Sequence, residues 1–333
     1  MSLATSYLGL ELKNPLVASA SPLNSKLDNI RRLEDAGVAA IVLPSLFQEQ
    51  IEADAEARLS FVDAYADSSP EASSYFHASI VGPYAVRPDR YLDLVRRARE
   101  AVSIPIIASL NGSSRAGWID HAWLMEQAGA TALELNMYHI PVDPLESGID
   151  VEARYLEIIR AVRGSIELPI SVKVTPYLSS LGHFAATIVE QGAAGLVLFN
   201  RLLEPDIDLS RMRLVDTLTL SNPGEMRLPM LWIALLSGRT NASLAASGGV
   251  SDVTDVVKYL LAGADVVMTT SALLRHGIEY AETLVNGLHR WMEERGIASV
   301  ASIRGMMSWH RSSDRDVYTR ANYLRILERY ATA

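Results

Sequence analysis

The sequence predicts an α/β protein that folds as a (β/α)8 barrel, also called a TIM barrel. Two observations support this fold. Short runs rich in Val, Ile, Leu and Ala alternate with longer amphipathic stretches, and a glycine-containing phrase recurs just before several of these runs. Such alternation is typical of repeated βα units around a parallel sheet. The chain has 333 residues, which is enough for one barrel of roughly 250 residues or more with insertions.

Eight apolar runs have the character of parallel strands that are buried on both faces. Each is nearly continuous in apolar residues, as expected where helices cover one face of a strand and the barrel core covers the other. In chain order, the expected strands are residues 16–19, 40–43, 105–110, 132–136, 170–174, 195–199, 243–246 and 265–269.

Helices are expected between these strands. Residues 90–102 place Leu92, Val95 and Ala98 on one helical face. A later helix begins after the capping residues Ser251 and Asp252 and ends at Gly263.

Four helix-to-strand turns contain a glycine in the phrase Ala-Gly-Ala or a close variant of it. These glycines are Gly37, Gly129, Gly192 and Gly263. Glycine adopts the left-handed conformation that ends a helix at little cost, so each of them would return the chain to the barrel.

Two connections are too long for a simple βα unit, namely residues 46–86 after the second strand and residues 201–241 after the sixth. Insertions after strands reach the carboxyl-terminal face of a barrel, where active sites lie. We therefore expect both insertions to lie over the site. No Gly/Ser-rich linker or charge run divides the chain, so we expect one domain over residues 1–333.

Composition excludes several function classes. The net charge of −9, without a dense Lys/Arg tract, argues against nucleic-acid binding. The absence of Cys excludes disulfides, thiolate nucleophiles and Cys-bound zinc or iron–sulfur clusters in this chain. The histidines show no metal-ligand spacing, so no metal is expected. No export signal and no membrane-spanning stretch is seen, which favours a cytoplasmic protein.

The loops after the last two strands predict a phosphate site. Ser247, Gly248 and Gly249 follow the seventh strand and precede a helix, and Thr270 and Ser271 follow the eighth. Barrels frequently bind a phosphate between these loops, because glycines permit close backbone approach and N–H groups at a helix start attract anions. The alternative is that the two glycines form only a tight strand-to-helix turn.

Polar residues in the fourth to sixth strands point to the same site. Lys173 lies inside an apolar strand, where its ammonium group costs several kcal/mol unless it meets an anion or a carbonyl. It could bind a ligand at the barrel mouth or form an ion pair with Glu134. Asn136 and Asn200 end their strands and could contact a ligand or complete a turn.

Together these residues carry a family resemblance. The motifs are Asn14-Pro15-Leu16, Glu134-Leu135-Asn136, SVKVTPY from Ser171 to Tyr177, Ser247-Gly248-Gly249 and Thr270-Ser271-Ala272-Leu273. They resemble, in order and over nearly the whole chain, the dihydroorotate dehydrogenases, especially the soluble class without a membrane helix.

The resemblance implies an FMN-containing barrel in which Lys173 lies at the flavin pyrimidine carbonyl. A cation there would stabilise the reduced ring. FMN contacts are implied at Ser19, Ala20, Ser21, Asn111, Asn136, Lys173, Ser247, Gly248, Gly249, Thr270 and Ser271. Substrate contacts are expected at Asn136, Asn200 and Arg201, although Arg201 could equally pair with Glu204, Asp206 or Asp208.

The chain departs from the family pattern at three places. The family uses a Cys or Ser in the loop after the fourth strand as base, and here His139 takes that position, with Tyr138 beside it. Imidazole is a suitable base near neutral pH, whereas Tyr138 would need a strongly lowered pKa, and His139 could also be an ordinary loop residue. Pro44 replaces a family Lys, and residues 77–83 lack the family's Asn-rich loop.

We therefore expect an FMN-dependent oxidoreductase in which the FMN-binding residues match the family pattern better than the orotate-binding residues do. The electron acceptor is expected to be a diffusible small molecule or a separate protein, with fumarate as the precedent in the family, and the resemblance also implies a homodimer. One alternative is a flavin-free lyase or isomerase that acts on a phosphorylated metabolite. Another is a non-catalytic flavin-binding homologue.

Overall fold

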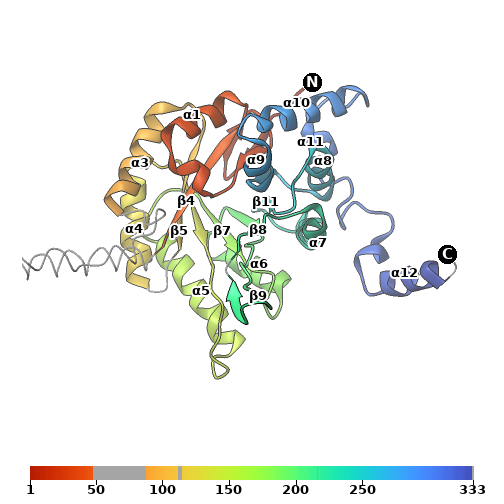
Figure 1. Ribbon diagram of the computed structural model, residues 1–333. Coiled ribbons are helices and arrows are strands. Elements are labelled where there is room, and N and C mark those ends of the chain that lie inside the picture. Colours follow the sequence, from red (N-terminus) through yellow and green to blue (C-terminus); the bar gives the residue numbers. More distant parts are fainter. Residues whose placement is uncertain (48–87, 112–114, 216, 332–333) are drawn as a thin grey trace, which may run out of the picture.

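The fold is a closed barrel of eight parallel strands surrounded by helices (Figure 1). The computed structural model describes residues 1–47, 88–111, 115–215 and 217–331. Around the barrel the strands follow the order β11-β12-β3-β4-β5-β6-β7-β8. The predicted fold class is confirmed.

All eight predicted strands are present. They are β3 (Leu16–Ala18), β4 (Ala40–Phe47), β5 (Ile106–Asn111), β6 (Ala132–Asn136), β7 (Ile170–Val174), β8 (Gly195–Leu198), β11 (Ser243–Ser247) and β12 (Val266–Thr269). The largest difference from the expectation is in β4, which continues to Phe47 instead of ending at Leu43. Its pairing with β5 shifts register between Val42 and Ser45, so Pro44 lies where the ladder is interrupted and needs no N–H donor.

Apolar side chains fill the interior of the barrel. Val17, Val42, Ile107, Ala132 and Val197 belong to one buried cluster, as expected when alternate residues of every strand face inward.

A hairpin of β1 (Thr5–Tyr7) and β2 (Leu10–Leu12) lies at the amino-terminal ends of the strands, where it adds Tyr7, Leu8 and Leu12 to the same cluster. The hairpin is tied there by Leu8 N–H, which donates to the Ser243 hydroxyl at 3.1 Å. A ligand therefore has to approach from the carboxyl-terminal ends.

Helices cover the outside of the barrel. The longer ones are α1 (Leu27–Asp35), α3 (Pro88–Ala101), α4 (Arg115–Gln127), α5 (Gly148–Arg163), α6 (Leu181–Glu190), α7 (Arg227–Leu236), α8 (Val253–Ala262) and α10 (Tyr280–Glu293). The helix predicted over residues 90–102 begins two residues earlier, as α3. The four predicted turn glycines all have φ between 92° and 124°, which confirms their role in ending helices.

Residues 201–241, predicted as an insertion, contain additional elements before the barrel helix α7. They form an antiparallel hairpin of β9 (Asp206–Asp208) and β10 (Arg213–Val215), followed by the short helix η3 (Pro223–Met226). The other predicted insertion, residues 46–86, lies outside the described residues except for Leu46 and Phe47.

The chain ends in shorter elements after α10. These are α11 (Val300–Ile303), η4 (Arg315–Tyr318) and α12 (Ala321–Ala331), and α12 stands apart from the barrel (Figure 1). Within the described part of the chain, no helix combines the length and the apolar character that crossing a bilayer requires.

Candidate functional site

The carboxyl-terminal ends of β5, β6 and β7 bring polar side chains together. In the strand register, Asn136 pairs with Lys173, and Glu134 pairs with Ser109 on one side and with Ser171 on the other. Residues two apart on a strand face the same side. Asn136 and Lys173 therefore share the row nearest the barrel mouth, and Glu134 belongs to the row below it.

Lys173 as a residue is only 8% exposed, and its ammonium group has no hydrogen bond and no carboxylate within 4.0 Å in the described part of the chain. The direct ion pair with Glu134 that the sequence left open is not formed. A buried cation without a direct partner is costly. Lys173 is thus the strongest indication of a ligand-binding site at this end of the barrel.

Three asparagines surround Lys173 with different bonding. The Asn136 amide donates to the Ser45 hydroxyl at 3.0 Å, and its carbonyl oxygen Oδ1 is buried without a partner. The Asn111 side-chain amide donates to the main-chain carbonyl of Asn136 at 2.6 Å, and the Asn200 side-chain amide donates to the main-chain carbonyl of Lys173 at 3.2 Å. Asn111 and Asn200 therefore hold neighbouring backbone with their N–H groups, whereas Asn136 offers an unpartnered acceptor.

The loop after β3 lies next to the end of β12. Ser19 N–H donates to the Thr269 carbonyl at 3.1 Å, and the Thr270 hydroxyl donates to the Ser19 carbonyl at 3.1 Å. The hydroxyls of Ser21 and Thr269 are buried without partners. The structure thus brings together the Ser19–Ser21 segment and the Thr270 segment, which the sequence assigned to one cofactor.

The two glycines after β11 differ in their surroundings. Gly249 is packed: a Cβ there would lie 2.8 Å from the Met226 Cβ and backbone N atoms. Gly248 has φ +101°, and a Cβ built on it would meet no heavy atom of the described residues within 4 Å. Gly248 therefore leaves room above its backbone, as a cradle for an anion requires.

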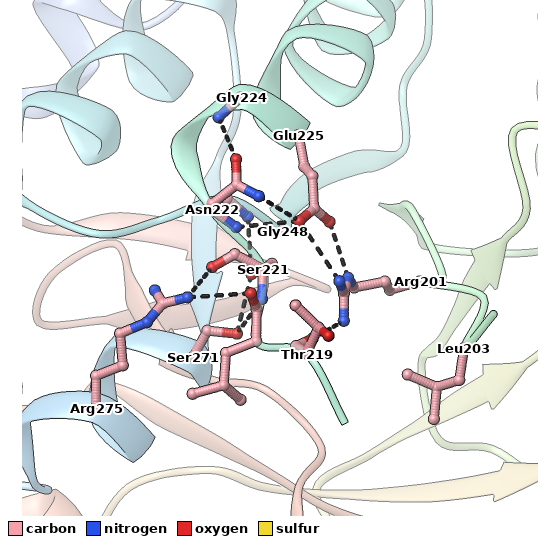
Figure 2. A network of polar contacts seen from close by, with 12 residues as sticks. Arg201, Leu203, Thr219, Ser221, Asn222, Gly224, Glu225, Gly248, Ser271 and Arg275 are labelled. Atoms are coloured by element: carbon pink, nitrogen blue, oxygen red, sulfur yellow. Dashed lines mark hydrogen bonds and ion pairs between the residues drawn. The ribbon is translucent and has the colours of Figure 1, made fainter. Parts of the chain in front are cut away.

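Ser221 connects the two predicted phosphate loops, and sequence reasoning missed it (Figure 2). Its hydroxyl accepts from Gly249 N–H at 3.2 Å and lies 2.9 Å from the Ser271 hydroxyl. The Ser-Asn-Pro-Gly turn ahead of α7 was the available signal, because Asn222 caps the short helix that follows it.

The start of α8 is already filled by its own acids. The Asp252 carboxylate accepts from Thr254 N–H at 2.7 Å and from Asp255 N–H at 3.2 Å, and the Asp255 carboxylate accepts from Ser251 N–H at 3.0 Å. The donors expected from this helix start are thus bonded within the helix. An anion beside Gly248 would therefore have to be bound by N–H groups of the turn itself and of the start of α9 (Ser271–His276).

Arg201 pairs with Glu225 and with none of the three acids considered from the sequence. Its Nε donates to Glu225 Oε2 at 2.8 Å, and another guanidinium N–H donates to the Thr219 carbonyl. Arg275 holds the same segment by donating to the Ser221 carbonyl at 2.6 Å (Figure 2). The two arginines therefore hold in place the segment from Thr219 to Glu225, which carries Ser221.

The loop after β6 carries the two candidate bases. His139 Nε2 is buried, lies 3.8 Å from Glu146 and has no hydrogen bond, and Glu146 also pairs with Arg154. Burial and the nearby Arg154 charge lower the pKa of His139 below its ordinary value. This shift favours the neutral imidazole, which is the form that accepts a proton. The Tyr138 hydroxyl instead accepts from Leu203 N–H at 3.1 Å.

Comparison with known proteins identifies similar sequences. The profile of the family described as "Dihydroorotate dehydrogenase" matches residues 84–292. The putative dihydroorotate dehydrogenase A (fumarate) of Aeropyrum pernix is 31% identical over 211 residues, covering 62% of this chain and 68% of the relative. The dihydroorotate dehydrogenase B (NAD(+)) catalytic subunit of Methanothermobacter thermautotrophicus is 26% identical over 316 residues, covering 91% and 98%. The protein of the same name from Pyrococcus abyssi is 24% identical over 311 residues, covering 91% and 98%.

Proposed function

This chain belongs to the dihydroorotate dehydrogenase family and is an oxidoreductase of that kind, and on this premise we propose that it uses FMN to oxidise dihydroorotate, or a related cyclic amide, at a CH–CH bond. The observation that carries the proposal is Lys173, a largely buried residue whose ammonium group has no hydrogen bond or ion pair among the described residues and which lies beside Asn136 at the carboxyl-terminal end of the barrel.

The residues present fit a flavin at this place. Among the described residues, the Asn136 Oδ1 atom and the hydroxyls of Ser21 and Thr269 are buried without a hydrogen-bond partner. Buried polar groups without partners are rare in folded proteins, and a ligand that bonds to them would remove the cost of leaving them unpaired. A heteroaromatic ring with N–H donors and carbonyl acceptors would satisfy this set. Ser19, Ala20, Ser21 and Asn111 would line the same ring.

The phosphate of FMN would lie at the Gly248 turn. Ser247 ends β11 and Gly248 follows it, Gly249 and Ser271 are joined through Ser221, and Thr270 precedes α9. Open space above Gly248 permits close approach of an anion to backbone N–H groups. We therefore add Ser221 to the residues that would hold this group.

Each remaining residue has a defined task in the proposed reaction. FMN would supply the hydride acceptor. Lys173 holds a positive charge that favours an anionic ring. His139 in its neutral form would remove the substrate proton, with Tyr138 or water as the alternative base. Asn136 and Asn200 would orient an amide-bearing ring. Arg201 is engaged in its ion pair with Glu225, so it would influence the ring only indirectly, through the Thr219–Glu225 segment, unless that ion pair opens.

Specificity is the part of the proposal in which this chain departs from its family. Pro44, at the irregularity of β4, supplies neither a charge nor an N–H donor, so orotate would lack one cationic contact. The other departure, at residues 77–83, lies outside the described residues. We therefore include related cyclic amides beside dihydroorotate as substrates.

The electron acceptor is proposed from the relatives. Their names contain fumarate in one case and NAD(+) in others, and the latter are named catalytic subunits. A diffusible small molecule or a separate protein is consistent with both. The homodimer, the single domain and the cytoplasmic location stay predictions.

Anaerobic titration of the purified protein tests the function directly. We expect a yellow protein whose flavin absorbance is bleached by dihydroorotate or by one member of a panel of cyclic amides. A colourless protein would favour the flavin-free lyase or isomerase. A yellow protein that no substrate bleaches would favour the non-catalytic homologue.

The phosphate site is tested by Gly248→Ala. The added Cβ enters the space proposed for the phosphate and strains a residue at φ +101°, so we expect FMN affinity to fall roughly tenfold or more. The matched control is Gly296→Ala, because Gly296 also has positive φ (+64°) and open surroundings but lies between α10 and α11. The control should lose stability without losing FMN affinity in a fluorescence titration of apoprotein. Equal FMN affinities in the two variants would show that Gly248 is not part of the phosphate site.

A further inference from the structure

Glu134 is a buried acid that the proposed chemistry does not use. It lies in β6, is 0% exposed, and neither of its carboxyl oxygens has a hydrogen-bond partner in the part of the chain that the structure describes. The strand register places it one inward-facing row below Asn136 and Lys173. It is therefore located between the apolar interior of the barrel and the candidate ligand site.

The polar groups that face Glu134 come from four elements: Tyr7 of β1, Tyr91 of α3, Ser109 of β5, and Ser171 and Lys173 of β7. Several of them are engaged elsewhere. The Tyr91 hydroxyl accepts from Ser109 N–H at 2.8 Å, the Ser109 hydroxyl shares a hydrogen bond with a serine of β4, and the Ser171 hydroxyl donates to a carbonyl of β6. The Tyr7 hydroxyl has no hydrogen-bond partner among the described residues, and neither Glu134 oxygen is within a full hydrogen bond of any of these groups.

Lys173 is the cation that acts on Glu134, but the two groups are not in direct contact, since no ion pair within 4.0 Å joins them. An ionised carboxylate without hydrogen bonds in a protein interior is strongly disfavoured. Burial raises the pKa of Glu134 above its ordinary value, and this effect exceeds the opposing effects of the Lys173 charge and of a contact with the Ser109 hydroxyl. The neutral acid is the form that this environment favours.

We propose that Glu134 is a positioning residue for Lys173: it remains a neutral carboxylic acid, so that the positive charge of Lys173 is left uncompensated and acts on the ligand at the barrel mouth. Ionisation of Glu134 would release one proton and place a negative charge beneath the ammonium group. The site would then lose most of its attraction for an anionic ligand. The part concerning the ligand rests on the proposed function, whereas the protonation state of Glu134 does not.

Thermal unfolding of Glu134→Gln tests the protonation state. Because the pKa of Glu134 is raised in the folded protein, the folded state keeps a proton that the unfolded chain releases. The stability linked to this proton is complete below the unfolded pKa and is lost as pH rises toward the folded pKa. Gln has no proton to lose. The Tm of Glu134→Gln should thus lie a few degrees above wild type at roughly pH 8, and the two should converge toward roughly pH 5.

The matched control is Glu100→Gln, an exposed glutamate of α3, whose Tm should follow that of wild type at both pH values. A Glu134→Gln protein that is less stable than wild type at alkaline pH would show that Glu134 is ionised in a stabilising contact, and it would overturn the proposal.

Infrared spectroscopy of the wild-type protein provides a measurement that does not depend on the variant folding. We expect the carbonyl stretch of a protonated carboxylic acid near neutral pH, shifted by carboxyl-labelled glutamate and absent from Glu134→Gln. The absence of this band from the wild-type protein would overturn the proposal. Both tests apply to the protein as purified, whether or not it holds a flavin, so their failure is distinct from failure of the proposed function.

The link to Lys173 is tested by binding of reduced FMN, whose ring is anionic, across the pH range in which the infrared band of wild type disappears. The affinity of the wild-type protein for reduced FMN should fall across this range, and that of Glu134→Gln should stay constant. An affinity that does not respond in the wild-type protein, or that falls equally in both, would overturn the action through Lys173.

Discussion

Lys173→Ala is expected to slow reduction of the bound flavin by substrate roughly 10²- to 10³-fold, the range found when a preorganised electrostatic contact is removed from an active site. The ammonium group has no hydrogen bond or direct ion pair in the described structure, so its loss should leave the barrel folded. Anaerobic stopped-flow measurement of flavin bleaching gives the rate, and circular dichroism melting reports on the fold.

The control for this experiment is Lys13→Ala, because Lys13 is an exposed lysine outside the barrel mouth. Its bleaching rate should equal that of wild type. If Lys173→Ala bleaches with substrate, and its photoreduced flavin reoxidises, both at the wild-type rate, then Lys173 is not part of the site.

His139→Ala is expected to slow substrate-driven flavin reduction by roughly 10²-fold or more, which is the usual contribution of a general base. The base works only when deprotonated, so the wild-type rate should rise with pH through the pKa of His139. Burial and Arg154 lower that pKa, and the plateau should therefore begin at a more acidic pH than an ordinary histidine would give. The variant should lose this limb of the pH profile.

His289→Ala serves as the matched control, since His289 is exposed on α10, and it should keep both the rate and the pH profile. An undiminished rate in His139→Ala would transfer the role of base to Tyr138 or to water. The Tyr138 hydroxyl accepts a hydrogen bond from Leu203 N–H, so Tyr138 could act as the base only if this contact rearranged.

Much of the fold follows from local sequence patterns. The eight strands were predictable because a strand buried on both faces must be apolar along its length, and the four turn glycines because other residues seldom adopt their conformation. The extension of β4 past Pro44 was not predictable, since it depends on a register shift against β5. The β1–β2 hairpin was also missed, because its strands have only three residues each.

The candidate site likewise contains features that the sequence predicts and features that it does not. The nearness of Asn136 to Lys173 follows from strand order, because parallel strands end at the same face of a barrel. The partner of Arg201 does not follow, since several acids are near in sequence and only packing selects Glu225.

The sequence by itself determined the barrel, the family and the positions of Lys173, Asn136 and the glycine turn. These depend on residue type and on spacing within one βα unit. Only the tertiary structure decided that Ser221 meets Ser271 and Gly249, that the α8 start is filled by its own acids, and that Glu134 lies unpartnered beneath Lys173. The physical reason is that hydrogen bonds and burial depend on distances of a few ångströms between side chains far apart in the chain, and these distances are set by the closed packing of all eight strands.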